Sequence, residues 1–173
     1  MSDKILVTYA TRYGSTQEVA EKVAATLRES GLAVDVLPTK QVQSLAGYHA
    51  VVLGTPLYIG SWLKDAQRFL TQHQAGLEKL PVAIFSLGPT RAGEGMAEVR
   101  ASLDTQVGKF PWLKPVAVEL FGGKYDPDKL RFPDTILKII PASPLHGQPA
   151  SDIRDWDAIR AWATSVATTL QKR

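Results

Sequence analysis

Short apolar runs alternate with segments of helical periodicity along the whole chain. Five runs have the length and residue types of β-strands, and they lie at residues 4–9, 33–37, 50–54, 82–86 and 116–121. Three of them are apolar at consecutive positions, over residues 5–7, 51–53 and 82–85. Strands of this kind are buried on both faces of a sheet, and they are usually parallel with helices on either side.

Helical spacing predicts five helices between and after these strands. The first begins after residue 14 and ends at Gly31, and the last covers residues 156–170 with Asp155 as its N-cap. Helical spacing also lies at residues 62–74 and, with a less regular pattern, at 94–107, and a short helix is predicted at 41–45. Five strands alternating with helices predict an α/β fold with a doubly wound parallel sheet in the order 2-1-3-4-5. In that topology a ligand binds at the carboxyl ends of strands one and three.

Residues 122–151, called the inserted segment below, interrupt the alternation between the fifth strand and the last helix. The segment is rich in proline and too long for a plain connection. Its apolar residues argue against disorder, and residues 134–140 predict a short amphipathic turn or helix bounded by prolines. We therefore expect one domain over residues 1–173 with an insertion before the last helix.

The loop after the first strand has the composition of a phosphate-binding site. Hydroxyl groups come from Thr11, Ser15 and Thr16. Gly14 permits a tight turn, and Arg12 adds a positive charge. Free N–H groups at a helix N-terminus bind anions, and such hydroxyls complete the shell. The loop lacks both the Gly-Lys-Ser/Thr and the Gly-x-Gly-x-x-Gly motifs, so we expect a single phosphate monoester, with a plain strand-to-helix turn as the alternative.

Composition narrows the classes of function that fit. The 173 residues carry a formal net charge of +3 and include no cysteine, which excludes disulfides and a catalytic thiol. Basic residues are scattered except near residues 124–138, so we expect no nucleic-acid binding. The three histidines lie far apart in the sequence, and we expect neither a metal site nor a catalytic side chain. Without a secretory pattern or an apolar run of about 20 residues, a cytoplasmic protein is expected.

The first loop and its flanks resemble the flavodoxin signature. The residues from Val7 to Val23 read Val-Thr-Tyr-Ala-Thr-Arg-Tyr-Gly-Ser-Thr-Gln-Glu-Val-Ala-Glu-Lys-Val. An aromatic residue ends the strand, a hydroxyl follows two residues later, and a small residue, a threonine and an alanine follow at the family's spacings. Thr8 departs from the pattern, because the family usually has an apolar residue there. The resemblance implies that FMN is the cofactor and that its phosphate is bound by Thr11, Arg12, Tyr13, Gly14, Ser15 and Thr16.

Two further loops agree with this resemblance. Residues 54–60 look like the family's loop over one face of the isoalloxazine ring, with Tyr58 offering an aromatic surface. The alternative for Tyr58 is an aromatic residue of the core. Residues 86–93 follow the fourth strand, where the family places the ring edge and its pyrimidine side. The FMN-binding residues implied in these loops are Pro56, Leu57, Tyr58, Ile59, Gly60, Ser86, Leu87, Gly88, Pro89, Thr90 and Gly93.

The inserted segment and the following Asp155-Trp156 resemble the flavodoxin-domain branch that includes the menaquinone-dependent protoporphyrinogen oxidases. This resemblance implies an oxidoreductase that passes electrons through bound FMN. Its partners would be a redox protein, a quinone or a small-molecule substrate, with a peripheral membrane contact through residues 124–140. The third loop is shorter and the inserted segment less rich in arginine and aromatic residues than in those oxidases, so porphyrin specificity does not follow.

Two other functions remain open from the sequence. One is an electron carrier that holds FMN but has no substrate of its own. Such carriers are typically acidic, so the net charge of +3 favours a quinone-linked enzyme. The other is a flavin-free binding module on the same fold. A signalling receiver is not expected, because the ends of the first and third strands lack aspartate. The oligomeric state is not predicted.

Overall fold

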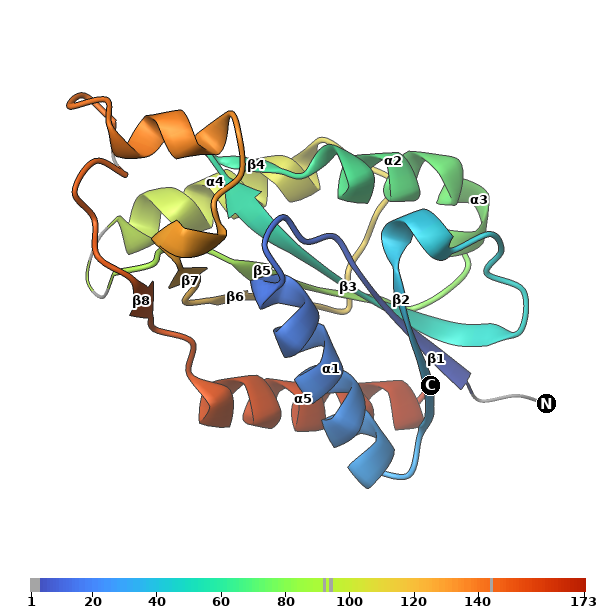
Figure 1. The fold of residues 1–173 in the computed structure, drawn as a ribbon. Coiled ribbons are helices and arrows are strands. Elements are labelled where there is room, and N and C mark those ends of the chain that lie inside the picture. The colour runs from blue at the N-terminus through green and yellow to red at the C-terminus, as the bar shows by residue number, and fades with distance from the viewer. Residues whose placement is uncertain (1–3, 92, 94, 144) are drawn as a thin grey trace.

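The computed structural model describes residues 4–91, 93, 95–143 and 145–173 (Figure 1). Five parallel strands form the sheet: β1 (Lys4–Tyr9), β2 (Ala33–Pro38), β3 (Tyr48–Tyr58), β5 (Val82–Leu87) and β6 (Ala117–Phe121). They lie in the order β2-β1-β3-β5-β6, which confirms the predicted topology with β5 and β6 as the fourth and fifth strands. The short β4 (Ser61–Trp62) pairs antiparallel with the end of β3.

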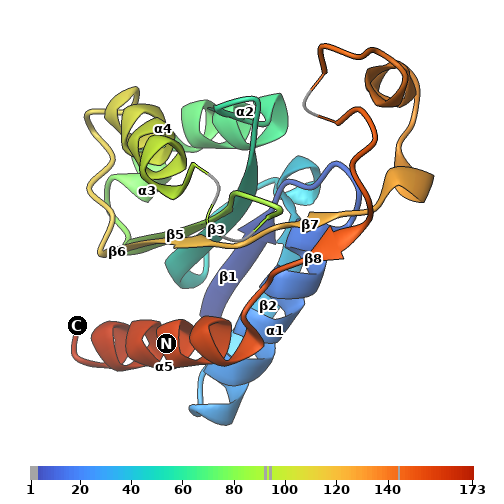
Figure 2. The same ribbon diagram turned by 90° about the vertical axis from the view of Figure 1, so that its left-hand side faces the viewer.

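Helices cover both faces of the sheet, as Figure 2 shows. One face carries α1 (Ser15–Glu29) and α5 (Trp156–Gln171). The other carries α2 (Lys64–Gln72), α3 (Gln74–Leu77) and α4 (Met96–Gly108). Within the described ranges no helix is both long enough and apolar enough to span a bilayer.

The predicted ends of the first and last helices are confirmed. Gly31 follows α1 with a φ of 90°, the left-handed conformation that ends many helices. At the start of α5, the Asp155 carboxylate accepts a hydrogen bond of 2.9 Å from the backbone N–H of Ala158. This bond satisfies one of the free donors at the helix N-terminus.

One predicted helix was wrong and another was wrong in part. The pattern at 41–45 gives no α-helix, because this stretch includes only the end of a 3-10 turn, η1 (Thr39–Gln41). The pattern at 62–74 begins with a strand and is broken at His73 into α2 and α3. Trp62 pairs with Leu57 across the hairpin, yet its ring is buried in the same cluster as α2, which explains the misleading periodicity. The predicted helix start at Glu94 lies outside the described residues.

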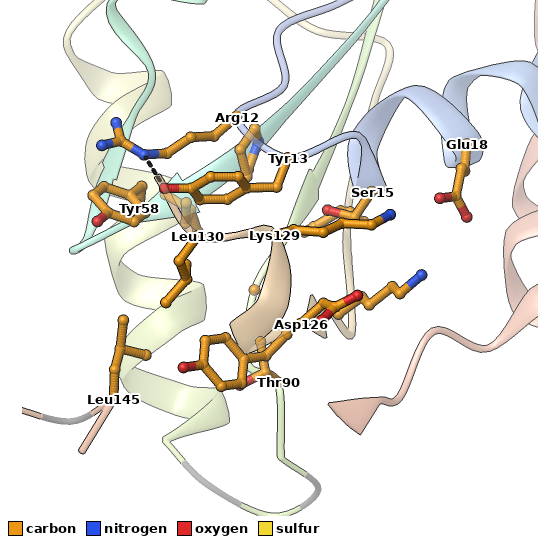
Figure 3. Close-up of a pocket in the computed structure, with 17 residues that line it drawn as sticks. Arg12, Tyr13, Ser15, Glu18, Tyr58, Thr90, Asp126, Lys129, Leu130 and Leu145 are labelled. Atoms are coloured by element: carbon orange, nitrogen blue, oxygen red, sulfur yellow. Dashed lines mark hydrogen bonds between the residues drawn. The ribbon is translucent and has the colours of Figure 1, made fainter. Parts of the chain in front are cut away.

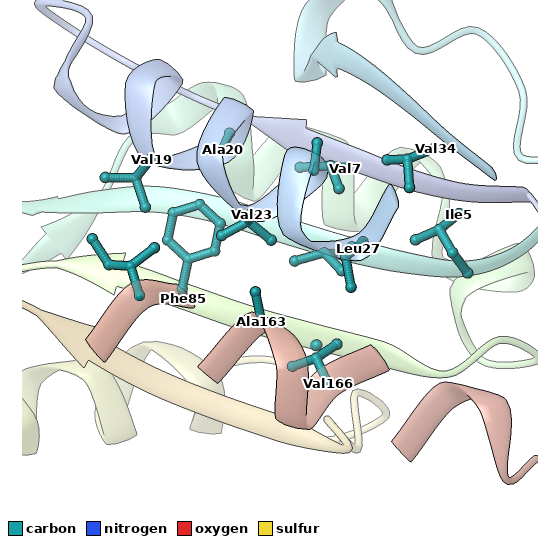
Figure 4. Close-up of a cluster of buried hydrophobic side chains, with 14 of the residues drawn as sticks. Ile5, Val7, Val19, Ala20, Val23, Leu27, Val34, Phe85, Ala163 and Val166 are labelled. Atoms are coloured by element: carbon teal, nitrogen blue, oxygen red, sulfur yellow. The ribbon is translucent and has the colours of Figure 1, made fainter. Parts of the chain in front are cut away.

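Two hydrophobic clusters hold the helices on the sheet. Beneath α1 and α5, Val23 and Val166 belong to one buried cluster with Val7 of β1 (Figure 4). Beneath α2 and α4, the other cluster contains Leu6 and Phe69. Neighbouring residues of β1 therefore belong to opposite clusters. This arrangement accounts for the apolar residues at consecutive strand positions. Polar loops can then lie only at the edges of the sheet, and ligands bind at the carboxyl edge.

The inserted segment is ordered by short elements of its own. These are β7 (Lys124–Tyr125), η2 (Pro127–Lys129), η3 (Asp134–Lys138) and β8 (Ser151–Asp152). Antiparallel pairing of β7 with β8 holds the two ends of the segment together. The turn or helix predicted within residues 134–140 is confirmed as the 3-10 helix η3, which stands out from the body of the molecule (Figure 2).

Gly54 is a sensitive position of the core, because a Cβ there would lie 2.1 Å from Cζ of Phe85. The Phe85 ring is fully buried, so it has no free space to move into. We predict that Gly54→Ala lowers the free energy of unfolding by about 1–3 kcal/mol in urea denaturation. Gly108→Ala is the control, because its Cβ meets no heavy atom within 4 Å. Equal losses in the two variants would contradict this explanation.

Candidate functional site

A cavity lies at the carboxyl edge of the sheet, where the strand order reverses between β1 and β3 (Figure 3). Open α/β sheets bind ligands at this point. The loop after β1 and the start of α1 contribute Arg12, Tyr13, Ser15 and Glu18. The end of β3 contributes Pro56, Leu57 and Tyr58, and the end of β5 with the loop after it contributes Leu87, Gly88 and Thr90. The inserted segment contributes Gly123, Lys124, Tyr125, Asp126, Lys129, Leu130 and Leu145. The structure thus brings together residues from all three predicted loops and adds a wall that was not predicted.

The loop after β1 leads directly into α1 and brings the N-terminus of this helix to the cavity. Gly14 immediately precedes α1 and has a φ of 91°, a left-handed conformation that residues with a side chain rarely adopt. Its N–H donates a hydrogen bond of 2.8 Å to Oγ1 of Thr11, which closes the turn. The N–H groups of the first helical turn have no partner within the helix. Ser15, the first residue of α1, lines the cavity, so the start of the helix lies at its wall.

The hydroxyl of Thr16 is buried and lacks a hydrogen-bond acceptor within the part of the chain that the structure describes. The residue is fully buried, and its Oγ1 has no hydrogen-bond partner among the described residues. Leaving a buried hydroxyl unpaired is unfavourable by about 1–3 kcal/mol. A phosphate group at the N-terminus of α1 would satisfy this hydroxyl, so the first turn of the helix fits a phosphate-bearing cofactor.

A buried carboxylate of the inserted segment connects the first two loops. Oδ2 of Asp134 accepts hydrogen bonds from Nε of Arg12, at 2.5 Å, and from the hydroxyl of Tyr13. Oδ1 accepts a bond of 2.7 Å from the hydroxyl of Tyr58. The Arg12 guanidinium also lies over the Tyr58 ring, 4.6 Å from its centroid. Arg12 is therefore directed at Tyr58 and Asp134, and its charge is matched by a carboxylate.

The protonation states of this cluster follow from burial and hydrogen bonding. Burial raises the pKa of Tyr58 to about 12, and the hydrogen bond to Asp134 acts in the same direction. Burial alone would raise the pKa of Asp134, but the hydrogen bonds from Arg12, Tyr13 and Tyr58 outweigh it and lower the pKa below 3.8. At neutral pH an ionised Asp134 thus accepts from Arg12 and from the protonated phenol of Tyr58.

The third loop is tied to both ends of the inserted segment. The N–H of Gly123 donates to the Pro89 carbonyl at 2.7 Å. Ser151 Oγ donates to the Thr90 carbonyl at 2.7 Å, and Gln148 Nε2 donates to Thr90 Oγ1 at 3.0 Å. The inserted segment therefore contacts all three loops of the site.

Several predicted residues lie beside the cavity instead of on its wall. Thr11 and Gly14 line an adjacent hollow that also contacts Arg12 and Tyr13, and Ile59, Gly60 and Pro89 line another that shares Thr90. Ser86 is buried, where its Oγ accepts a bond of 3.0 Å from Nε1 of Trp62. Of the predicted residues that the structure describes, those outside all of these linings are Thr16, Ser86 and Gly93.

Among the cavity residues that sequence reasoning missed are Tyr125 and Glu18. Tyr125 is 7% exposed, and its hydroxyl has no partner within the described part of the chain. Glu18, in the first turn of α1, pairs with Nη1 of Arg154 at 3.0 Å, so its charge beside the helix N-terminus is balanced. One signal was available for Tyr125, since a chain leaving the fifth parallel strand necessarily starts at the ligand-binding edge.

The ionised Asp134 should make the stability of the fold dependent on pH. Because its pKa is lowered on folding, its contribution is present above its unfolded-state pKa and is lost as pH falls through the folded-state value. We predict that Asp134→Asn destabilises the chain most near neutral pH and that the difference from wild type shrinks below about pH 4. Urea denaturation at several pH values measures this difference. A difference independent of pH would show that the carboxylate charge is not involved.

Comparison with known proteins places this geometry in a family. The family model described as "Flavodoxin domain" matches residues 6–141. Protoporphyrinogen IX dehydrogenase [quinone] of Escherichia coli K12 is 30% identical over 86 residues, which cover 49% of this chain and 48% of the relative. NAD(P)H dehydrogenase (quinone) of Cupriavidus metallidurans is 32% identical over 91 residues, covering 40% of this chain and 46% of the relative. The chain spans about half the length of the curated relatives it matches.

Solved structures show the same fold at low sequence identity. A C101A mutant of flavodoxin from Pseudomonas aeruginosa aligns with a TM-score of 0.61 and 17% identity, covering 97% of this chain and 99% of that one. Oxidised Flavodoxin 1 from Bacillus cereus aligns with a TM-score of 0.59 and 14% identity, covering 98% of each chain. The match to the family model over most of the chain, on a sheet with this strand order, shows that the protein belongs to the flavodoxin-domain family.

Proposed function

We propose that the chain binds FMN in the cavity at the carboxyl edge of the sheet and acts as an oxidoreductase through it. The observation that carries this proposal is the unpartnered, buried hydroxyl of Thr16 at the start of α1. The helix N-terminus adds N–H donors and partial positive charge, which suit a phosphate monoester. Tyr58 and neighbouring leucines supply an aromatic and apolar wall suited to a flavin ring.

The residues divide into a phosphate end and a ring end. Ser15, Thr16 and the first-turn backbone of α1 would hold the phosphate. Leu57, Tyr58 and Leu87 would contact the ring and exclude water from it. Bound FMN supplies the redox chemistry by accepting and releasing electrons. On this proposal the side chains bind and orient the cofactor and substrate, and no catalytic acid or base is required.

We extend the proposal to a quinone as the electron acceptor. Both curated relatives described above have a quinone in their names, and the structural neighbours named flavodoxin share less than 20% identity with this chain. Protoporphyrinogen IX is the first electron donor to test, because the relative from E. coli is named for it. The second candidate, a carrier without a substrate, is favoured only by the overall flavodoxin fold.

Reduction and reoxidation separate these two candidates. A quinone-linked enzyme should lose its visible flavin absorbance in a single step during anaerobic titration, and a soluble quinone should reoxidise it rapidly. A carrier should bleach in two distinct steps and react slowly with the quinone.

The residues that flank η3 support a peripheral membrane contact, which would give access to a quinone dissolved in the bilayer. Phe132 is 79% exposed and Ile139 is 72% exposed, and the basic residues Arg131 and Lys138 lie between and beside them in the sequence. Apolar side chains flanked by basic ones fit an anionic lipid surface. We therefore propose such a membrane as the occupant of this face.

Thr16→Val tests the phosphate assignment. Valine keeps the shape of threonine and removes the unpartnered hydroxyl, so the chain without cofactor should keep its free energy of unfolding or gain stability. Affinity for FMN should fall about tenfold, because a hydrogen bond to a charged phosphate is lost, while affinity for riboflavin should not change. Calorimetric titration with the two flavins measures both constants.

Thr8→Val is the matched control. Thr8 has the same fully buried, unpartnered hydroxyl, but it lies inside β1 and not in the first turn of α1, where the phosphate is proposed to bind. This variant should therefore keep the wild-type affinity for FMN. The assignment fails if Thr16→Val binds FMN as tightly as wild type, and the proposed function fails if the wild-type chain binds no FMN.

Phe132→Asp combined with Ile139→Asp tests the membrane contact. Two charges on an apolar surface should abolish cosedimentation with vesicles that contain phosphatidylglycerol. Met96→Asp is the control, because Met96 is 48% exposed on α4 and lies outside the inserted segment. Absence of wild-type binding to these vesicles, or equal effects of the two changes, would refute the contact.

A further inference from the structure

We propose that Asp134 is a positioning residue of the FMN site, through which the inserted segment sets the arrangement of the two loops that hold the cofactor. The inference rests on the proposed binding of FMN and assigns a role to the inserted segment within that site. It concerns the carboxylate of Asp134 and its three hydrogen-bond donors, Arg12, Tyr13 and Tyr58.

The first argument is convergence from distant parts of the chain. Arg12 and Tyr13 belong to the loop after β1, whereas Tyr58 ends β3. All three donate to one carboxylate more than 70 residues further along the chain, at sequence separations of 122, 121 and 76. A shared acceptor makes the positions of these donors depend on one another. Removing it would free the two loops to move separately.

The second argument is the orientation of the inserted segment. Asp134 is 4% exposed, whereas the neighbouring Phe132 is 79% exposed and Ile139 is 72% exposed. Packing alone would favour the opposite arrangement, with the apolar side chains inside and the charge outside. Burial of a carboxylate is unfavourable unless charged and hydrogen-bonding partners compensate it. Asp134 is the buried residue of η3, and its carboxylate is directed toward the site loops.

The third argument is the effect on Tyr58, which lines the cavity. Its hydroxyl is held by Oδ1 of Asp134 at 2.7 Å, and its ring is covered by the Arg12 guanidinium at 4.6 Å from the centroid. Arg12 is in turn held by Oδ2 of the same carboxylate at 2.5 Å. Asp134 therefore fixes the hydroxyl of Tyr58 directly, and it fixes the face of the ring indirectly, through Arg12. A ring fixed in this way presents a prepared surface to a flavin.

The same geometry changes the role of Arg12. Its side chain reaches toward Tyr58, away from the labelled Ser15 at the start of α1 (Figure 3). With its charge matched by Asp134, Arg12 acts on the loop that contacts the ring. The phosphate is left to the backbone donors and hydroxyls of the first turn of α1.

Asp134→Asn in the full chain tests the proposal. The dissociation constant and the dissociation rate of FMN should both rise about tenfold, because asparagine cannot hold all three donors. Flavin fluorescence measures both quantities, and the visible circular dichroism of bound FMN should change as the ring surface loosens. Asp128→Asn is the matched control, since Asp128 is an exposed carboxylate of the same segment.

Tyr58→Phe separates positioning from folding, because it keeps the ring and removes the hydroxyl that Asp134 holds. The variant should bind FMN less tightly, and its effect should not add to that of Asp134→Asn. A purely structural Asp134 would lower the unfolding temperature of the cofactor-free chain while leaving FMN affinity, flavin dichroism and this coupling unchanged, which would overturn the inference. A wild-type chain that binds no FMN would overturn both proposals, whereas unchanged FMN binding in Asp134→Asn would overturn this one alone.

Discussion

Parallel pairing of β1, β3 and β5 brings the ends of these strands to one edge of the sheet, and the whole site depends on this constraint. Burial on both faces leaves that edge as the place where polar loops can lie. The N-terminus of α1 reaches the same edge because the helix follows β1 after a short loop. The N-terminus of α1, Tyr58 and the inserted segment are far apart in the sequence, yet they meet at this edge.

The parts of the fold and site that depend on local patterns could be predicted. Short apolar runs, three of them continuous, identified the strands, and the hydroxyl and glycine residues around the start of α1 identified the loop at its N-terminus. Local patterns failed where tertiary contacts decide. Ile59 has a φ of 50° in the turn between β3 and β4, a conformation that β-branched residues avoid, so Gly60 alone of the two turn residues signalled the hairpin. Trp62 kept a helical spacing while forming a strand.

The contacts of the inserted segment could not be predicted for a different reason. A buried carboxylate and an exposed one have the same sequence signal, and the partners of Asp134 lie far from it along the chain. Its neighbours also reverse the usual rule, since apolar side chains face outward. The exposed side chains of η3 and the buried carboxylate give the segment two faces, one toward the site loops and one available to a membrane surface. The length of the inserted segment is explained if one face contacts the site loops and the other contacts a membrane.

Hydrogen–deuterium exchange of the full chain, measured with and without FMN, tests the central claim most directly. If FMN binds between the loops and the inserted segment, amide protection should rise in residues 11–18, 55–60 and 87–90 and also in residues 123–134. Protection confined to the three loops would show that the inserted segment is not part of the site. No change anywhere would contradict FMN binding by this chain.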